Sequence, residues 1–563
     1  MEREMDKSNL HDTEQVLTDL FSKVFELPPE ALGRDTQLAE LGADSLLLFE
    51  VLTPIQKAFG VKLSVRQFFS ELQTVAKLAA YIHAHSQISE GPADARPAQG
   101  RPFQWMNRSN APVESAARQQ YLDEFIPRYN ARTKKSKAHA VEVRNLIADS
   151  RSGIGFKPSI KELLYPLVCR EFNGATLRDL DGNDYIDMTM GFGSHLFGHL
   201  PAFVSSALKE QVEEGFGLGT RHELALEVAR LVCEITGMHR VAFVNSGTEA
   251  IMNAVRAARA ATGRNHIVLF SSSYHGHWDA VLATADRFDA GAKTRPVSVG
   301  IPVNMVADVS VFEFGSSEAL KFIASHGSKI AAVLIEPVPT RDPGLADPVY
   351  LQQLREATSL VGTLLIFDEI VTGFRVHPAG IQGLYGIEAD IVTYGKTIGG
   401  GMPMGLIAGR GHTLDAIDGG NWNYGDNSFP GVEPTFFGGT FFQHPLAMKT
   451  ARATLLEIKR GGVAFTQALS QKTAAFTSRL NDLFQSRGID IEARVFSSFF
   501  RLIHKENMDL LYYNLLIRGV YIWEWRCWFL SAAHENSHLD AVFEAFVHSM
   551  DELQAQALTA IRK

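Results

Sequence analysis

The sequence predicts an α/β fold built on a mostly parallel, doubly wound sheet, preceded by a separate all-α four-helix bundle. Three observations lead to this prediction. After about residue 116, apolar runs rich in Val, Ile and Phe alternate with amphipathic stretches. Before residue 88, apolar residues recur at three- and four-residue spacing, as in helices. A small, polar, Pro-rich segment separates the two parts.

The N-terminal part, residues 1–88, has the pattern of a small helical bundle. Apolar residues recur along Val16, Leu17, Leu20, Phe21 and Val24. The pattern returns over 46–59, and 75–82 gives a last short helix. Some 80 residues in three or four short helices are enough for such a bundle.

Residues 89–115 are predicted to form a flexible linker. The run that begins Ser89-Glu-Gly-Pro-Ala-Asp-Ala-Arg-Pro is small, polar and rich in Pro. About 25 flexible residues span roughly 25–30 Å root-mean-square. The N-terminal domain could therefore visit a site on the domain formed by residues 116–563.

The second domain shows strand and helix patterns in alternation, which favours a mostly parallel sheet. Ligands in such sheets bind beyond the carboxyl ends of the strands. Asp368 and the Ser246 loop both fall at such ends. The predicted strands are 240–245, 266–270, 330–335 and 364–368, and the predicted helices include 249–261 and 351–360.

Composition excludes several classes of protein. The chain of 563 residues is 45% hydrophobic with a formal net charge of −9, which gives no support to nucleic-acid binding. The charged N-terminus lacks the core of a signal peptide, and no apolar run approaches the ~20 residues that span a bilayer. The three cysteines are widely spaced and suggest neither disulfides nor a metal site. We expect a soluble cytoplasmic protein without a metal.

A lysine and an aspartate form the most informative pair. Lys396 stands in Tyr-Gly-Lys396-Thr-Ile-Gly-Gly-Gly, and Asp368 ends the strand-like run Leu364-Leu-Ile-Phe-Asp368. Pyridoxal phosphate chemistry requires such a pair. The lysine amine holds the cofactor aldehyde as a Schiff base, and the aspartate keeps the pyridine nitrogen protonated.

Other motifs could complete a cofactor site. Ser246, Gly247 and Thr248 lie between a strand and a helix, where hydroxyls and free amides form a phosphate cup. The same Ser-x-x-Glu pattern also predicts an ordinary helix capping box. Tyr274 could stack on the pyridine, and Ile370 could pack on the opposite ring face. Without the neighbouring motifs, the sequence would predict only that Tyr274 is a tyrosine of the hydrophobic core.

Ser45 follows Asp44 at the start of the predicted second helix of the bundle. Asp and Ser are preferred helix caps, so the isolated tripeptide Asp44-Ser-Leu needs no further role. In its context, after Thr36-Gln-Leu-Ala-Glu-Leu-Gly and ahead of a linker, it resembles the acyl/peptidyl carrier domains of polyketide and nonribosomal peptide synthases. The resemblance implies covalent phosphopantetheine on Ser45, loaded by a phosphopantetheinyl transferase.

The second domain resembles the class III pyridoxal phosphate aminotransferases, close to glutamate-1-semialdehyde aminomutase. The motifs Ser-Gly-Thr-Glu-Ala, Tyr-His-Gly, Ile-Glu336-Pro, Phe-Asp368-Glu-Ile-Val-Thr-Gly-Phe-Arg, Tyr-Gly-Lys396 and Gly-Gly-Thr440 occur in the order of that family. The resemblance implies fold-type I, with a smaller C-terminal domain from about Leu446. It implies the roles given above for Lys396, Asp368, Tyr274 and the phosphate cup, and a homodimer with shared active sites, in which Thr440 reaches the partner's cofactor phosphate.

Details narrow the resemblance to aminotransferase domains embedded in polyketide–peptide synthases. The runs after Glu336-Pro-Val and around Arg526 depart from the aminomutase pattern. The resemblance then implies a 3-oxoacyl thioester acceptor, a glutamate- or glutamine-like donor and other synthase enzymes as partners. A donor carboxylate needs a cation, for which Arg526, Arg341 and Arg151 are candidates, although each could be a structural ion-pair partner. Ser194 and Glu336 are further candidates for substrate contacts.

Three alternatives stay open. An aminomutase would shift an amine within one substrate with the same residues. A free aldehyde could be the acceptor while the carrier serves another enzyme. A non-catalytic docking protein is the third, and the intact Lys396 and Asp368 argue against it.

Overall fold

The computed structural model describes residues 115–150, 153, 156–285, 294–556 and 558, together with residues 71–86 and positions 13–14, 17–18, 20–22, 32–37, 55, 59, 61, 63 and 67. Ser45, Arg151 and most of the predicted linker, residues 89–114, lie outside the described residues. Residue contacts divide the chain into two compact units, Met1–Ala98 and Gln99–Lys563.

The described part of the first unit packs around one apolar cluster. Its helix α4 (Val75–Ser86) contains the predicted helix 75–82 and runs four residues further. Val75, Leu78, Ala79 and Ile82 of this helix are buried against Leu17, Phe21, Leu32, Ile55, Val61, Leu63 and Leu72. The helical spacing in the sequence therefore marks the buried face of α4.

The second unit is built on a seven-stranded sheet in the order β4-β12-β11-β10-β9-β5-β8. Only β12 runs antiparallel to its neighbours, so the sheet is mostly parallel, as predicted. The four predicted strands are confirmed as β4, β5, β9 and β10. In sheet order the bounds are β4 (Arg240–Val244), β12 (Gly405–Gly409), β11 (Ile391–Gly395), β10 (Leu364–Asp368), β9 (Ile330–Ile335), β5 (His266–Phe270) and β8 (Val309–Phe312).

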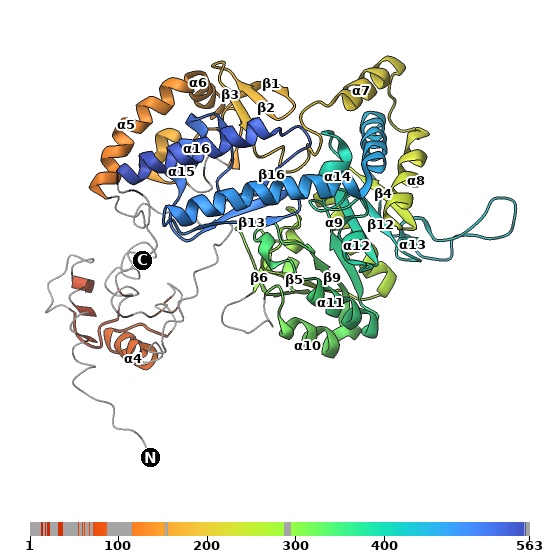
Figure 1. Ribbon diagram of the computed structural model, residues 1–563. Coiled ribbons are helices and arrows are strands. Elements are labelled where there is room, and N and C mark those ends of the chain that lie inside the picture. Colours follow the sequence, from red (N-terminus) through yellow and green to blue (C-terminus); the bar gives the residue numbers. More distant parts are fainter. Residues whose placement is uncertain are drawn as a thin grey trace. The chain divides into compact units, whose positions relative to one another are not determined.

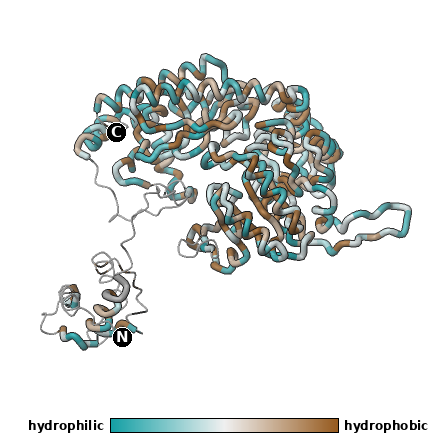
Figure 2. Tube along the Cα trace, turned by 60° about the horizontal axis from the view of Figure 1, so that its bottom comes forward, coloured by the Kyte–Doolittle hydropathy of each residue, from teal (hydrophilic) through white to brown (hydrophobic). Residues whose placement is uncertain are grey.

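Helices cover both faces of this sheet. In β5, Val268 and Phe270 join one apolar cluster, whereas Ile267 and Leu269 join another. Side chains alternate between the faces of a strand, so the two clusters lie on opposite faces. Figure 2 shows apolar residues concentrated in these interior strands. The first face is covered by α8 (Leu224–Thr236), α10 (Ser317–His326), α11 (Pro348–Val361) and α12 (Gly380–Tyr385), and the second by α9 (Gly247–Thr262) and α13 (Asp415–Asp418).

The smaller domain is not purely C-terminal. The long helix α14 (Pro445–Ser486) contributes Met448 and Leu455 to the sheet core and Leu480 and Phe484 to the core of the small domain (Figure 1). That second core also takes residues near residue 121 from α5 (Ala116–Arg132), and β3 (Asp184–Asp187) pairs in parallel with β15 (Val520–Tyr521). The small domain therefore does not consist only of residues after about Leu446, as expected, because the segment that starts at Ala116 packs on the C-terminal elements.

The remaining elements complete these domains. They are α5 (Ala116–Arg132), α6 (Lys134–Val143), β1 (Cys169–Asn173), β2 (Thr176–Asp179), β3 (Asp184–Asp187), α7 (Ala202–Glu214), β6 (Ala283–Ala285), β7 (Thr294–Pro296), β13 (Ile491–Phe496), β14 (Phe499–His504), α15 (Asp509–Ile517), β15 (Val520–Tyr521), β16 (Trp528–Phe529) and α16 (Asn536–Ala555). Among the described residues, no helix is both long and apolar enough to cross a membrane.

Candidate functional site

The candidate site lies at the carboxyl edge of the parallel strands. Asp368 ends β10, and Lys396 follows β11 directly as the first residue of a 3-10 turn, Lys396–Gly399. Glu336 follows β9, the Tyr274 loop follows β5, and Ser246 follows β4. Parallel strands present their carboxyl ends at one edge, so segments far apart in sequence meet here.

Lys396 carries an amine that is free to react. Its backbone is left-handed, with φ of 44°. Its Nζ forms no hydrogen bond or ion pair with any described residue. Burial lowers the pKa of Lys396, while the carboxylates of Glu336 and Asp368 oppose this shift. The lowered pKa increases the fraction of neutral, nucleophilic amine.

Asp368 is a buried carboxylate with fixed orientation. Its Oδ2 lies 2.7 Å from His275 Nδ1. Its Oδ1 accepts hydrogen bonds from the Ile370 amide (3.1 Å) and from Thr393 Oγ1 (3.4 Å). His275 Nε2 is buried without a partner among the described residues. Sequence reasoning gave His275 no role, although the residue stands next to Tyr274 in a quoted motif.

Glu336 is a second buried acid in the site. Its carboxylate accepts hydrogen bonds from Thr340 Oγ1 (3.0 Å), the Thr340 amide (3.3 Å) and the Tyr274 amide (3.1 Å). Burial and the nearby Asp368 carboxylate raise the pKa of Glu336. The acid thus ties the Tyr274 loop to the segment after β9. The Tyr274 side chain is 52% exposed, which leaves its ring open to a ligand.

The start of α9 has the Ser246 cap of the simpler alternative, but Glu249 reaches the Asn245 amide rather than the Ser246 amide of a capping box. Ser246 Oγ accepts a hydrogen bond from the Glu249 amide at 3.2 Å, and Glu249 Oε2 accepts one from the Asn245 amide at 2.8 Å. A helix N-terminus still offers its first free amides to an anion. The cap and a phosphate site are therefore compatible.

Two loops meet closely beside this helix start. Thr248 Oγ1 lies 3.2 Å from His277 Nδ1 and accepts a hydrogen bond from the His277 amide at 3.3 Å. Gly276 has φ of 85°, and a Cβ added there would lie 2.4 Å from Thr248 Oγ1. Only glycine fits at this position.

Ile370 lies between two further glycines. A Cβ at Gly247 would meet its side chain at 3.2 Å, and one at Gly395 would meet it at 3.0 Å. The structure therefore brings Ile370, the α9 start and the strand leading to Lys396 together.

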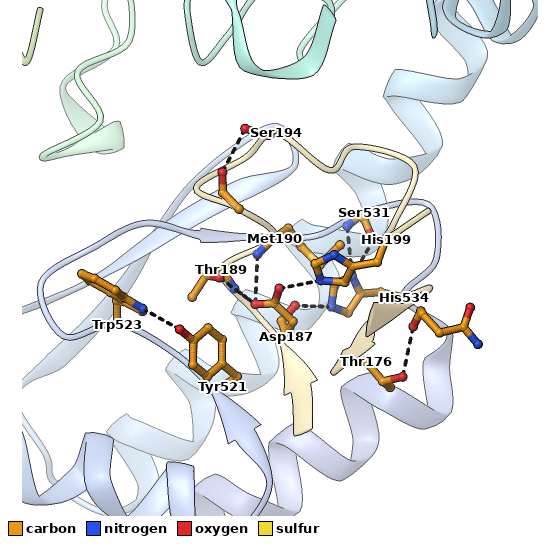
Figure 3. Close-up of polar contacts among 12 residues, drawn as sticks. Thr176, Asp187, Thr189, Met190, Ser194, His199, Tyr521, Trp523, Ser531 and His534 are labelled. Carbon is orange, nitrogen blue, oxygen red and sulfur yellow. Dashed lines mark hydrogen bonds and ion pairs between the residues drawn. The ribbon is translucent and has the colours of Figure 1, made fainter. Parts of the chain in front are cut away.

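Ser194 belongs to a left-handed turn near Lys396. Residues 190–193 all have positive φ, between 44° and 95°. Asp187 Oδ1 holds the turn by accepting from the Thr189 amide (2.7 Å) and the Met190 amide (3.0 Å), and Asp187 Oδ2 lies 2.9 Å from His199 Nε2 (Figure 3). Ser194 Oγ donates to the Gly191 carbonyl at 3.0 Å, so its hydroxyl closes the turn.

Arg375 anchors this turn and was also missed as a functional residue. It is fully buried and donates to the carbonyls of Gly193 (2.6 Å) and Leu530 (3.2 Å) and to Ser498 Oγ (3.0 Å). No carboxylate of the described residues pairs with it. Burial lowers its pKa to about 9. Thr397 Oγ1 donates to the same Gly193 carbonyl at 3.4 Å, which links the turn to the residue after Lys396.

The remaining predicted residues are more exposed. Arg526 is exposed and Arg341 half-buried, and neither guanidinium pairs with an acid among the described residues. The structural ion-pair alternative is therefore not observed for them. Thr440 lies in the exposed segment between α13 and α14, away from hydrogen-bonding contact with the residues above.

Comparison with known proteins agrees with this arrangement. Residues 159–509 match the family model for class III aminotransferases, and residues 15–82 match the model for a phosphopantetheine attachment site. A glutamate-1-semialdehyde 2,1-aminomutase from Methanothermobacter thermautotrophicus is 36% identical over 403 residues, covering 68% of this chain and 91% of the relative.

Two solved structures are similar to the second unit. A transaminase with PLP bound has a TM-score of 0.67 at 28% identity, covering 75% of this chain and 99% of that chain. A β-phenylalanine aminotransferase from Variovorax paradoxus has a TM-score of 0.66 at 27% identity, covering 79% and 100%.

These matches establish the two cofactors by class. A class III aminotransferase domain works with pyridoxal phosphate, and a phosphopantetheine attachment domain carries 4′-phosphopantetheine covalently. The fold-type I architecture expected from the motifs is likewise confirmed. The chain therefore belongs to the class III aminotransferases and carries a phosphopantetheine attachment domain ahead of its aminotransferase domain.

Proposed function

We propose that this enzyme moves an amino group from an amino acid onto a carbonyl of an acyl chain that its own N-terminal domain carries as a thioester. The acceptor carbonyl is at the 3-position, the carrier serine is Ser45, and the setting is polyketide or nonribosomal peptide biosynthesis. One observation carries the proposal. A half-buried lysine amine without a hydrogen-bond partner among the described residues, close to the carboxylates of Asp368 and Glu336, lies in a class III domain on the same chain as a phosphopantetheine attachment domain.

The residues of the site fit pyridoxal phosphate. The start of α9 at Ser246, Gly247 and Thr248 would hold the phosphate, and the close approach of Gly276 supports a loop shaped for this purpose. Tyr274 and Ile370 would contact the ring. Asp368, oriented by His275, would pair with the ring nitrogen.

Lys396 would move protons during transfer. When bound, pyridoxal phosphate supplies an electron-accepting ring that stabilises negative charge at the donor Cα. Lys396 Nζ would take the proton from the donor Cα and later return a proton to the acceptor carbon. Its lowered pKa suits this exchange between base and acid. The donor leaves as a keto acid, and the acceptor carbonyl becomes an amine.

The carrier would make the second half of the reaction effectively intramolecular. A tethered acyl chain has a high local concentration at the site, which raises the rate of encounter. A phosphopantetheinyl transferase would load Ser45, and other synthase enzymes would supply and remove the acyl chain.

We further propose a homodimer with shared sites. The segment between α13 and α14 projects from the unit (Figure 1) and exposes Tyr424 (92%), Phe429 (77%) and Phe436 (80%). Aromatic side chains that are this exposed are typical of an interface. Thr440 lies in the same segment and would reach the partner's phosphate.

An aminomutase reaction is the second candidate, favoured by the similarity to the Methanothermobacter glutamate-1-semialdehyde 2,1-aminomutase. It would use the same lysine and aspartate. Release of a free keto acid from a separate donor, measured for each amine transferred, separates the two reactions.

The test uses the full chain with Lys396→Ala and Ser45→Ala variants. Lys396→Ala should lose the visible absorbance of the bound cofactor and lower turnover by at least about 1,000-fold, because it removes the proton-carrying group. Ser45→Ala should keep that absorbance but accept no phosphopantetheine and aminate no carrier-bound chain. An active Lys396→Ala protein would refute the lysine assignment. Phosphopantetheine on Ser45→Ala would refute the carrier assignment.

A further inference from the structure

Two neighbouring parallel strands lead into the segments that flank Lys396. Strand β3 pairs in parallel with β15, and Asp187 lies opposite Tyr521 in this register. The Met188 amide continues the pairing by donating to the Tyr521 carbonyl at 3.0 Å. Parallel strands present their carboxyl ends at one edge, so the segments that follow β3 and β15 leave the sheet side by side.

Each of these segments carries an aromatic residue that contacts the other. Phe192 follows β3, and Trp523 follows β15. Their ring centroids lie 5.1 Å apart with an angle of 85° between the planes, which is an edge-to-face contact. Trp523 Nε1 donates to Tyr521 Oη at 3.0 Å and so orients the indole (Figure 3). We call Phe192 and Trp523 the aromatic pair.

Both segments of the aromatic pair reach the surroundings of Lys396. The carbonyl of Gly193, the residue after Phe192, accepts a hydrogen bond from Thr397 Oγ1 at 3.4 Å. On the other segment, Cys527 lies near Lys396: burial lowers the pKa of this lysine, and Cys527 is close enough to oppose that shift. A substrate whose carbonyl reaches Lys396 therefore brings its adjoining atoms close to these two segments.

The aromatic pair keeps apolar surface open to water at a conformational cost. Phe192 has a left-handed backbone with φ of 56°, which is unfavourable for a bulky side chain, and its ring is 40% exposed. Trp523 is half-buried. Backbone strain of this kind persists mainly at functional sites. An apolar ligand that displaces water from the two rings would lower the free energy of the complex.

The acyl chain of the acceptor has the chemistry of such a ligand. A donor of the glutamate or glutamine type ends in charged or amide groups, which favour water over aromatic rings. In a 3-oxoacyl thioester, the pantetheine arm leaves on one side of the 3-carbonyl and an uncharged tail leaves on the other. The methylenes of this tail gain free energy in proportion to the apolar area that they bury. Trp523 also belongs to the run around Arg526 that departs from the aminomutase pattern, as a different acceptor would require.

We propose that the aromatic pair binds the apolar tail of the acceptor, so that Phe192 and Trp523 select long 3-oxoacyl chains over short ones. This inference rests on the proposed amino transfer and names the class of its acceptor. That class is an acyl chain with an alkyl or aryl tail of about five or more carbons beyond the 3-carbonyl, since a shorter tail leaves most of the two rings in water.

The test compares 3-oxobutanoyl and 3-oxo-octanoyl chains on the full-chain holoenzyme. A phosphopantetheinyl transferase loads each chain onto Ser45 from its coenzyme A thioester, and glutamate or glutamine starts the reaction. Mass spectrometry of the chain released from the thioester gives the rate of amination. The longer chain should react at least about tenfold faster, because its four additional methylenes cover the rings.

Two variants remove the rings one at a time. Phe192→Asn and Trp523→Gln should each slow the longer chain by at least about fivefold and the shorter chain by less than about twofold. Asn tolerates a left-handed backbone, and Gln keeps a donor for Tyr521. The control is Phe172→Asn, which makes the same change at a ring 49% exposed on β1 and should leave both rates unchanged. Visible absorbance of the bound cofactor shows which variants fold, and either folded variant decides the test.

Three results would overturn the inference. The first is equal rates for the two chains in the wild type, and the second is a variant that slows both chains to the same extent. The third is a variant that light scattering shows to be monomeric from a dimeric wild type, which would assign the aromatic pair to a subunit interface. Amination of either loaded chain would still uphold the proposed function, whereas absence of amination of every loaded chain would refute that function.

Discussion

The single residues that define the site are buried or half-buried ionisable groups without an ion-pair partner. Arg375 is fully buried and has carbonyl and hydroxyl acceptors and the Phe529 ring as partners, and half-buried Lys396 has no hydrogen-bond partner among the described residues. Glu336 and Glu369 carry raised pKa values. Uncompensated burial of charge reduces stability, and proteins retain it mainly where function requires it.

The effect of a buried ionisable group on the free energy of unfolding can be measured at Glu369. It is fully buried, its Oε2 accepts from the Ile381 amide at 2.7 Å and from Thr372 Oγ1 at 2.9 Å, and burial raises its pKa to about 7. The folded state then binds this proton more tightly than the unfolded state, where the pKa is about 4.3. The free energy of unfolding should fall as pH rises from about 4.3 through 7.

Glu369→Gln removes this titration with little change of shape. Between pH 5 and pH 8 the wild type should lose about 2–3 kcal/mol more stability than the variant. Calorimetric unfolding of both proteins at the two pH values measures the difference. Equal losses in both proteins would contradict a raised pKa at this residue.

Residue types in the sequence predicted part of the site. Lys396, Asp368 and Glu336 each stand in or beside a strand end, where a short motif is enough to find them. His275 and Arg375 act through residues that are 93 and 182 positions away, at Asp368 and Gly193. Such contacts depend on how the elements pack, and local spacing carries no signal for them.

At the level of elements, the contact between the β5 loop and the start of α9 shapes the phosphate end of the site. Gly276 in the loop has φ of 85° and leaves no room for a Cβ beside Thr248. Gly300 has nearly the same φ, 88°, but a Cβ there would meet nothing within 4 Å. Substitutions at these two glycines therefore distinguish the effect of backbone strain from the effect of close contact.

Gly276→Ala should weaken binding of pyridoxal phosphate by at least about tenfold. The added Cβ must push the loop away from Thr248, and an alanine with positive φ costs about 1–2 kcal/mol in addition. Gly300→Ala bears only the backbone cost and should bind the cofactor normally. Titration of both apo variants with pyridoxal phosphate gives the affinities. Equal weakening in both would show that the close contact contributes nothing.

Strands were easier to predict than their directions. Four apolar runs marked β4, β5, β9 and β10 because buried strands are short, continuous and rich in β-branched residues. The run Gly405–Gly409 forms β12, which enters the sheet antiparallel between β4 and β11. A short apolar run contains no information about direction, since direction is fixed by the path of the connecting chain. The contribution of residues after Ala116 to the small domain was also missed, because packing between segments far apart in the sequence leaves no local pattern.

At the scale of the whole molecule, one segment of the chain exposes several large aromatic side chains close together. Tyr424, Phe429 and Phe436 in the segment between α13 and α14 are each at least 77% exposed. The segment is held at its base, where Arg256 donates to the Phe436 carbonyl at 2.9 Å. A second copy that covers these aromatics would also bring Thr440 to a neighbouring site, and such a self-complementary contact is the common form of a twofold dimer.

The double variant Tyr424→Ser/Phe436→Ser should therefore change both assembly and cofactor binding. Loss of two buried aromatic contacts costs several kcal/mol of association, enough to shift a micromolar sample from dimer towards monomer. Without the partner's Thr440, affinity for pyridoxal phosphate should fall by roughly tenfold. Light scattering gives the mass and cofactor titration gives the affinity. Val299→Ser, at a side chain 99% exposed outside this segment, serves as the control and should change neither. A variant that remains dimeric, or a monomer with unchanged cofactor affinity, would refute the shared site.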